Sequence, residues 1–259
     1  MAKDKTEGIP TILRGLIMLE QVAKAQRPIS ATEIREKLNL PKPTVNRILS
    51  QLEEEGFLQR EPVKKRYIPG SRAKEAVLSI MSSEDVGAPR HSILQALSDE
   101  IGETCNCTIL DGDRTVYFDR VEANWPYRIQ LPVGSRLPLH CTASGKLFLA
   151  YMNSRQRQRL INAAPLKRNT DRTITDPDLL MDELKKIRKE GVGIDDEELM
   201  DGMVAISVPV FNEKNEICFT VAVHAPSIRK PLEVLRQYLP SLRKAAAAMA
   251  VTYCKTLDD

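Results

Sequence analysis

"SATEIREKLNLPKPTVNRILSQLEEEGFLQREPVKKRYI", residues 30–68, holds the signals that decide how the first part of this 259-residue chain folds. Ser30 followed by Glu33 matches a capping box, in which each side chain accepts the other residue's backbone N–H. Asn39-Leu40 marks a tight turn. Pro41-Lys42-Pro43 suits the first turn of the next helix, where a missing N–H costs little. Two short helices joined by such a turn predict a helix-turn-helix.

The neighbouring residues extend this module in both directions. Thr11 to Ala25 has apolar residues at helical spacing, which predicts an amphipathic first helix. Its predicted inward stripe is Ile12, Leu16, Leu19, Val22 and Ala23. The third helix has the inward stripe Val45, Ile48, Leu49 and Leu52. It ends at Gly56, and two short alternating runs, Phe57–Arg60 and Arg66–Ile68, follow. We therefore predict a two-stranded wing and, over residues 1–70, a winged helix-turn-helix domain.

The inward stripe of the third helix leaves polar residues on its outer side. The predicted DNA contacts are these residues and two wing lysines: Lys42, Pro43, Thr44, Asn46, Arg47, Lys64 and Lys65. The N-terminal half of a recognition helix enters the major groove. Arg47 can bond guanine bidentately and Asn46 can bond adenine, whereas lysines suit phosphates, which position the protein without reading sequence.

Charge is unevenly distributed along the chain. Residues 1–70 hold 13 Lys+Arg and 9 Asp+Glu, a balance of +4, whereas the remaining residues hold 25 and 26, a balance of −1. A basic first quarter on a neutral body favours contact with a polyanion. Five cysteines without framework spacing favour free thiols in the cytoplasm. No apolar run approaches the roughly 20 residues that span a bilayer, so we expect no membrane association.

The pattern changes after residue 70. Residues 71–81 keep helical periodicity and residues 82–87 break it, which predicts a linker helix over residues 71–87. The predicted elements that follow are helices at 90–101, 142–151, 176–190 and 231–253, and strands at 104–110, 115–121, 128–131, 204–211 and 217–224. Strand pairs and helices in this order predict an α+β domain with an antiparallel sheet over residues 88–259.

Four stretches together resemble one known family. They are "IPTILRGLIMLEQVAKAQRPISATEIREKLNLPKPTVNRILSQLEEEGFLQREPVKKRYIPG", "RLPLHCTASGKLFLA", "GVGIDDEELMDGMVAISVPVF" and "EICFTVAVHAPSIR". From Ile9 to about Tyr253 the chain resembles the IclR family of bacterial transcription regulators. The resemblance implies a winged helix-turn-helix joined to a GAF-like effector-binding domain. The family commonly starts its recognition helix with P-K-S-T-V or S-K-S-T-V, and Pro43 stands here in the place of the serine.

The stretch "PLHCTASGK", Pro138–Lys146, allows several chemical interpretations. A P-loop would need glycine at His140 and Ser or Thr at Leu147, so that motif is absent. Neighbouring side chains on an extended segment point in opposite directions, which disfavours His140 and Cys141 as a catalytic pair. Cys105-x-Cys107 lacks the usual zinc spacing, and we expect no metal site. The favoured interpretation is a helix N-terminus whose backbone N–H groups bind an anion.

The resemblance implies which residues surround that anion. In this family the loop binds the acidic end of a small effector, which implies amide contacts at Ala143 and Ser144 and a polar contact at Asp195. The remaining implied effector contacts are Ile129, Leu137, Ala205, Ala222 and His224. Family members often carry serines at the two strand positions held here by Ala222 and His224, and a cysteine at that of Ala205. The alternative for His224 is a core histidine with its hydrogen bonds satisfied.

The sequence thus predicts a cytoplasmic, ligand-responsive transcription regulator, such as a repressor of catabolic genes, without enzymatic activity or a cofactor. Its predicted partners are a palindromic or near-palindromic DNA operator, a small carboxylate-bearing effector (aliphatic or aromatic), and further copies in a homodimer or dimer of dimers. The alternative is a small-molecule hydrolase that uses Cys141 and His140 and carries an accessory DNA-binding domain. That alternative requires turnover that Cys141→Ala abolishes.

Overall fold

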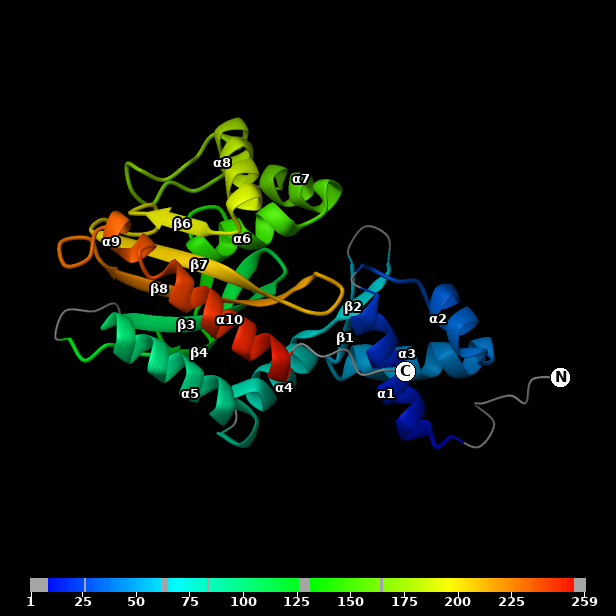
Figure 1. Cartoon of the computed structure of the whole chain (residues 1–259). Coiled ribbons are helices and arrows are strands. Elements are labelled where there is room, and N and C mark those ends of the chain that lie inside the picture. The colour runs from blue at the N-terminus through cyan, green and yellow to red at the C-terminus, as the bar shows by residue number, and fades with distance from the viewer. Residues whose placement is uncertain are drawn as a thin grey trace. The chain divides into compact units, whose positions relative to one another are not determined.

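The computed structural model describes residues 9–25, 27–61, 65–82, 84–125, 131–163 and 165–253. The chain divides into two compact units, residues 1–81 and 82–259 (Figure 1). The domain boundaries predicted from the sequence, at residues 70 and 87, lie on either side of this division.

The first unit is built from short helices followed by a small antiparallel sheet. Its elements are α1 (Thr11–Lys24), α2 (Ala31–Leu38), α3 (Lys42–Glu54), β1 (Leu58–Arg60) and β2 (Tyr67–Pro69). The predicted capping box is present, because Ser30 and Glu33 exchange both expected bonds at the start of α2. Asn39 then turns the chain in the left-handed region, with φ 49°. β1 and β2 pair as the predicted wing. Lys64, one of the two predicted wing contacts, lies outside the described residues.

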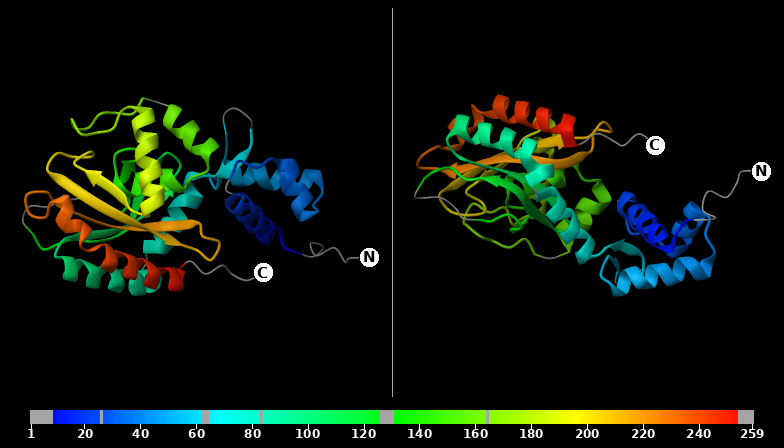
Figure 2. Two further views of the ribbon diagram at one scale, coloured as in Figure 1. Left: turned by 45° about the horizontal axis from the view of Figure 1, so that its top comes forward. Right: turned by 90° about the horizontal axis from the view of Figure 1, so that it is seen from below.

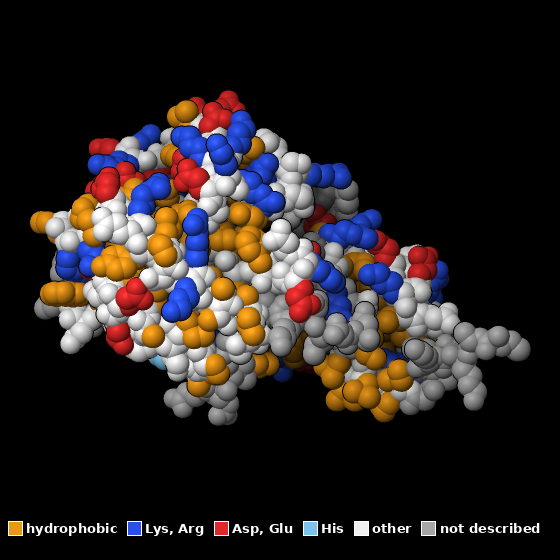
Figure 3. Space-filling model, viewed as in Figure 1, with side chains coloured by type: hydrophobic (Ala, Val, Ile, Leu, Met, Phe, Trp, Pro, Cys, Tyr) orange, Lys and Arg blue, Asp and Glu red, His pale blue; other side chains and the backbone are white. Residues whose placement is uncertain are grey.

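The predicted inward stripe of α1 was wrong in part. Val22 is buried and Leu19 packs against the core, as predicted. Gly15, Met18 and Val22 are the buried residues of this helix, whereas Ile12 is 75% exposed and Leu16 is 57% exposed. The prediction failed because Gly15 lies on the buried face, and a glycine is not counted as an apolar residue when a helix face is predicted from spacing. A Cβ added to Gly15 would meet Ile48 at 3.8 Å, so α3 packs closely against this face. The exposed apolar side chains form a hydrophobic patch on the surface of α1 (Figure 3).

The two helices nearest the division between the units differ from the predicted linker. α4 (Ser71–Ser82) matches the predicted periodicity, but α5 (Glu84–Ile101) begins within the segment expected to break the helix. Pro89 lies inside α5. It is the sixth residue of the helix, beyond the first turn where proline is tolerated, so it removes one backbone hydrogen bond and its ring crowds the carbonyl four positions earlier.

The second unit is a six-stranded antiparallel sheet between two layers of helices. The strand order is β5-β4-β3-β8-β7-β6. The strands are β3 (Thr104–Asp111), β4 (Arg114–Val121), β5 (Arg136–Pro138), β6 (Gly193–Asp196), β7 (Met203–Phe211) and β8 (Ile217–Pro226). The other helices are α6 (Ala143–Tyr151), α7 (Ser154–Asn162), α8 (Pro177–Glu190), α9 (Leu232–Arg236) and α10 (Leu239–Tyr253). α5 and α10 lie side by side on one face of the sheet, and α6 packs on the other face with α8 behind it (Figure 2).

Several predicted elements of this unit were wrong or missing. The strand predicted at 128–131 falls mostly on residues outside the described part of the chain, and Leu131 is not in a strand. β5, β6 and α7 were not predicted. The single closing helix is two helices, because Pro240 starts a new helix at its second position instead of continuing α9. None of the described helices is long and apolar enough to cross a membrane.

Strand alternation gives the sheet one apolar face and one polar face. Cys105 and Cys107 of β3 are buried, and Cys107 lies 3.8 Å from Met249 of α10. Asn106 and Thr108 point the opposite way, toward α6. A bulge between Cys107 and Thr108 shifts the pairing of β3 with β4. The face turned toward α6 therefore carries polar side chains, and the pocket forms there.

Candidate ligand-binding pocket and DNA-binding helix

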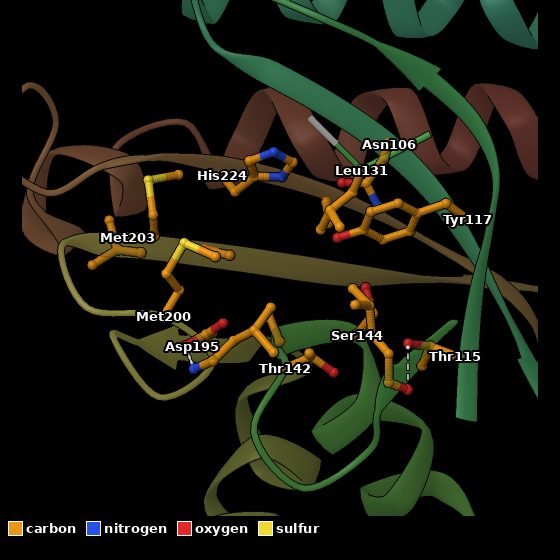
Figure 4. A pocket seen from close by; sticks show the side chains of 16 residues that line it. Asn106, Thr115, Tyr117, Leu131, Thr142, Ser144, Asp195, Met200, Met203 and His224 are labelled. Atoms are coloured by element: carbon orange, nitrogen blue, oxygen red, sulfur yellow. Dashed lines mark hydrogen bonds between the residues drawn. The ribbon is translucent and has the colours of Figure 1, made fainter. Parts of the chain in front are cut away.

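A pocket lies between the N-terminus of α6 and the polar face of the sheet (Figure 4). Its described lining residues are Asn106, Thr115, Tyr117, Leu131, Leu137, Thr142, Ala143, Ser144, Asp195, Leu199, Met200, Met203, Val204, Ala205, Ala222 and His224. The polar members come from the sheet and from the start of α6, and the two methionines come from the loop before β7 and its first residue. The cavity is thus apolar at one side and hydrogen-bonding at the other.

The start of α6 presents free backbone N–H groups to this pocket. The hydroxyl of Thr142 accepts the N–H of Gly145 at 3.1 Å, and its carbonyl accepts that of Lys146 at 2.9 Å. In the described part of the chain, the amides of Ala143 and Ser144 have no hydrogen-bond partner. With the positive end of the helix dipole, two such amides can bind an anion.

Two glycines allow α6 to begin where it does. A Cβ on Gly145 would lie 2.4 Å from the carbonyl oxygen of Leu139, and one on Gly193 would lie 2.0 Å from that of Ala143. Both distances are far below van der Waals contact. β6 therefore approaches the first turn of α6 closely, and Asp195, two residues after Gly193, reaches the pocket wall.

The Ser144 hydroxyl faces the sheet. It bonds Ser207 of β7 at 3.0 Å and accepts from Thr220 of β8 at 2.9 Å. All three side chains are buried. This small network fixes the helix start against two strands, so the backbone amide of Ser144, and not its hydroxyl, is available to a ligand.

Asp195 is a buried carboxyl, 5% exposed. Its Oδ1 accepts the backbone N–H groups of Glu198 at 2.8 Å and Leu199 at 3.2 Å. Burial raises its pKa to about 7, against the opposing effect of the Glu198 N–H. Asp195 thus exchanges its proton near neutral pH, while its backbone contacts shape the loop that leads to β7.

The histidine and tyrosine on the opposite wall are uncharged. Burial lowers the pKa of His224 to about 3 and raises that of Tyr117 to about 12. Nε2 of His224 and Oδ1 of Asn106 are buried and have no hydrogen-bond partner among the residues that the structure describes. The expectation that His224 could be a satisfied core histidine is therefore wrong for Nε2.

A buried ion pair joins α6 to the loop after Asp195. The Lys146 ammonium group, on a side chain that is 1% exposed, pairs with the carboxylate of Glu198 and lies 3.7 Å from that of Glu183 on α8. Sequence reasoning missed this pair, because Glu198 is separated from Lys146 by 52 residues. Lys146 thus joins α6 to the loop that follows Asp195.

His140 and Cys141 do not form a nucleophile–base pair. Nε2 of His140 lies 2.9 Å from the carbonyl oxygen of Lys167, and the Cys141 sulfur accepts the amide of Asn169 at 3.1 Å. Burial raises the pKa of the Cys141 thiol to about 12. A reactive cysteine needs a lowered pKa, so these contacts do not support the hydrolase hypothesis. In the described residues no group of three or more His, Cys, Asp or Glu side chains could hold a metal ion.

The structure brings most of the predicted effector residues together. Leu137, Ala143, Ser144, Asp195, Ala205, Ala222 and His224 all line the pocket. Ile129 lies outside the described residues. The sequence prediction missed the lining residues Asn106, Thr115 and Tyr117, although strand alternation in β3 and β4 would have placed them on one face. That the residues predicted from the sequence contact an effector stays a prediction.

The predicted DNA contacts of α3 lie at its surface. Lys42, Pro43, Asn46 and Arg47 are exposed and Thr44 is half-buried. The Arg47 guanidinium donates to Gln51, one turn along, at 3.4 Å. In the wing, Lys65 is exposed, with φ 50°.

Comparison with known proteins identifies both units. Residues 11–62 match the IclR helix-turn-helix domain, and residues 78–251 match the family described as bacterial transcriptional regulator IclR C-terminal. The probable transcriptional regulator SauR of Cupriavidus necator is 42% identical over 94% of this chain and 96% of its own length. The transcriptional repressor IclR of Escherichia coli is 28% identical, over 96% of this chain and 91% of its own.

Solved structures agree with this relationship. The crystal structure of Thermotoga maritima IclR has 29% identity and a TM-score of 0.61, covering 93% of this chain and 97% of that one. A double mutant of the inducer-binding domain of PobR from Acinetobacter, solved in complex with 3-hydroxybenzoic acid, has 28% identity and a TM-score of 0.57. It covers 62% of this chain and 94% of that one. The chain belongs to the IclR family of bacterial transcriptional regulators, with an N-terminal helix-turn-helix and a C-terminal ligand-binding domain.

Proposed function

We propose that this regulator senses a small carboxylate-bearing effector in the pocket at the start of α6 and alters transcription of catabolic genes in response. The observation that carries the proposal is the pair of unpartnered amides, Ala143 and Ser144, at a helix N-terminus that opens into the pocket. Backbone amides can hold an anion without a cationic side chain. The proposed action is binding alone, with no catalytic step.

The other end of the effector meets the groups on the facing walls. Asp195 lies on the same cavity wall as the start of α6 (Figure 4). It accepts a hydrogen bond from a donor group of the effector and does not face the effector's acid group, because an ionised carboxylate repels another. His224 is neutral and takes part as a hydrogen-bonding imidazole. Leu137, Ala205, Ala222 and, by resemblance, Ile129 provide the apolar walls. The 3-hydroxybenzoic acid complex of the related PobR domain supports an acid that also carries a donor group.

On the DNA side, we propose that α3 reads a palindromic or near-palindromic operator, as the two-fold symmetry of a dimer requires. Arg47 and Asn46 are the proposed base contacts. Lys42, Lys64 and Lys65 are the proposed phosphate contacts, and Pro43 and Thr44 complete the surface of the first turn. The protein would act as a homodimer or dimer of dimers.

Ala143→Leu tests the effector site. The larger side chain fills the space before α6, so the acid that binds the wild type best in a thermal-shift screen should lose affinity by at least about tenfold. Titration calorimetry measures this loss. Ala163→Leu, at the exposed C-terminal end of α7, is the matched control and should bind like the wild type. Operator binding without effector should be unchanged in both variants. Equal affinity of Ala143→Leu and wild type would place the effector elsewhere.

A further inference from the structure

We propose that the effector is a zwitterion: its acid group binds the amides at the start of α6 and its positively charged amino group binds Asp195. This inference rests on the proposed function and narrows it to amino acids in the broad sense. It follows from the charges and hydrogen-bonding groups around Asp195.

The Asp195 end of the pocket has an excess of buried acid. Lys146 is already paired with Glu198 and lies 3.7 Å from Glu183. Glu183 also lies 3.8 Å from the exposed ammonium group of Lys186. With Asp195 included, three carboxyl groups therefore face two ammonium groups, and only that of Lys146 is buried. No Lys or Arg side chain is among the described residues that line the pocket. A cationic group supplied by the effector would therefore balance the charge at this end.

The geometry of Asp195 leaves one oxygen for such a group. Both backbone donors, Glu198 and Leu199, bind Oδ1. Among the described residues, none donates a hydrogen bond to Oδ2, and the carboxyl group lies on the cavity wall together with Thr142 and Ser144 (Figure 4). One ligand can thus reach both the helix start and the free oxygen of Asp195.

An ammonium group fits this position better than a hydroxyl group. Either can donate to Oδ2, but a hydroxyl leaves the excess of acid uncompensated. A hydrogen bond between an ammonium and a carboxylate is roughly twice as strong as one between neutral groups. Burial strengthens the difference, because charges interact more strongly where water is excluded.

The other titratable groups around Asp195 do not compete for this role. Cys141, which precedes α6, and Tyr117 of β4 are uncharged, since burial raises both pKa values to about 12. His224 of β8 is neutral. Arg120 acts on Tyr117 and His224, and its Nε lies 3.3 Å from Glu122.

Isosteric pairs of ligands test the inference directly. Each pair has an amino group in one member and a hydroxyl group in the other: glycine and glycolate, β-alanine and hydracrylate, γ-aminobutyrate and γ-hydroxybutyrate, phenylglycine and mandelate. Calorimetry of the full chain measures each affinity. Wild type is compared with Asp195→Asn and with Asp196→Asn, a matched control on the same strand whose carboxylate pairs with Arg172 near the surface.

Proton exchange provides a second, independent measurement. At pH 7 about half of Asp195 is protonated in the free protein, because its pKa is about 7. An ammonium ligand ionises Asp195 and releases about half a proton on binding. A hydroxy acid brings a net negative charge, which raises the pKa of Asp195, and therefore takes up a similar amount. Titration in buffers that differ in ionisation enthalpy gives the sign. Asp195→Asn should abolish the exchange.

The inference is supported if at least one amino acid binds about tenfold or more tighter than its hydroxy partner and releases a proton. That advantage must disappear in Asp195→Asn and persist in Asp196→Asn. It is overturned if every hydroxy acid binds as tightly as its partner, or if no amino acid binds. The proposed function is judged separately: it stands if hydroxy acids bind wild type and not Ala143→Leu, and it fails if Ala143→Leu changes no affinity.

Discussion

Lys146 ends the run Thr142–Lys146, and its ammonium group is not exposed at the helix start. It is buried and paired with Glu198 on a loop distant in sequence. Gly145 admits no side chain, and Thr142 caps the helix. These three residues therefore have structural roles, as an ion pair, a close backbone contact and a helix cap, that composition alone does not predict. The two residues of the run that contribute to the proposed binding, Ala143 and Ser144, do so through their backbone amides.

Removing Lys146 should be costly. Lys146→Met leaves the Glu198 carboxylate buried without its partner, and we expect a loss of about 3–5 kcal/mol in the free energy of unfolding. Lys185→Met removes an exposed pair with Asp182 and should cost less than about 1 kcal/mol. Urea unfolding measures both.

A second variant separates lost charge pairing from lost packing. The double change Lys146→Met with Glu198→Gln should recover much of the stability, because no unpaired charge remains. If Lys146→Met alone costs no more than Lys185→Met, the buried pair has no such role.

The proton on Asp195 should also appear in stability. Its folded pKa of about 7 lies above the ordinary value of 3.8. The folded state therefore holds a proton that the unfolded state releases, and this stabilisation is present in full below about pH 4 and lost as the pH rises to about 7. As the pH rises from about 4 to about 7, the free energy of unfolding of wild type should therefore fall by about 4 kcal/mol relative to that of Asp195→Asn. Chemical unfolding at several pH values measures it, and Asp196→Asn should show no comparable slope.

At the scale of elements, local signals predicted helix ends well. The capping box at Ser30 and Asp176-Pro177 before α8 are both caps in the structure, and Gly191 ends α8 in the left-handed region. These signals involve residues a few positions apart. β6 was missed because its four residues carry two aspartates and no alternating apolar pattern. Only pairing with β7 makes it a strand.

α3 and the wing should contribute differently to DNA binding. Arg47→Ala should weaken binding to the preferred operator by about 1–3 kcal/mol and relax preference at the base pair that it reads.

Lys65→Ala should weaken binding to all DNA and lower the slope of log affinity against log salt by about one. Selection from a randomised library followed by anisotropy titrations at several salt concentrations measures both. Equal losses on operator and random DNA for Arg47→Ala would remove it from base reading.

At the scale of the whole molecule, the pocket depends on contacts that no local pattern encodes. Gly193 and Ala143 are fifty residues apart, but the close approach of their backbones sets the position of Asp195. Resemblance to the family identified seven described lining residues, because it carries information about such contacts. It did not identify Asn106 or Tyr117, and periodicity alone could not tell which face of the sheet α6 would cover.

The two units should separate in function. Each has its own buried core, and the second holds the complete described pocket. A fragment from Ser71 to the end should fold, remain self-associated and bind the effector with the affinity of the full chain, but should not bind operator DNA. Sedimentation and calorimetry at micromolar concentration test this. We expect the fragment to self-associate because a protein that reads two half-sites must be a dimer. The second unit together with α4 offers more surface for a dimer interface than the first unit does. A monomeric fragment that still binds effector would instead assign self-association to the first unit, where Ile12 and Leu16 of α1 are exposed.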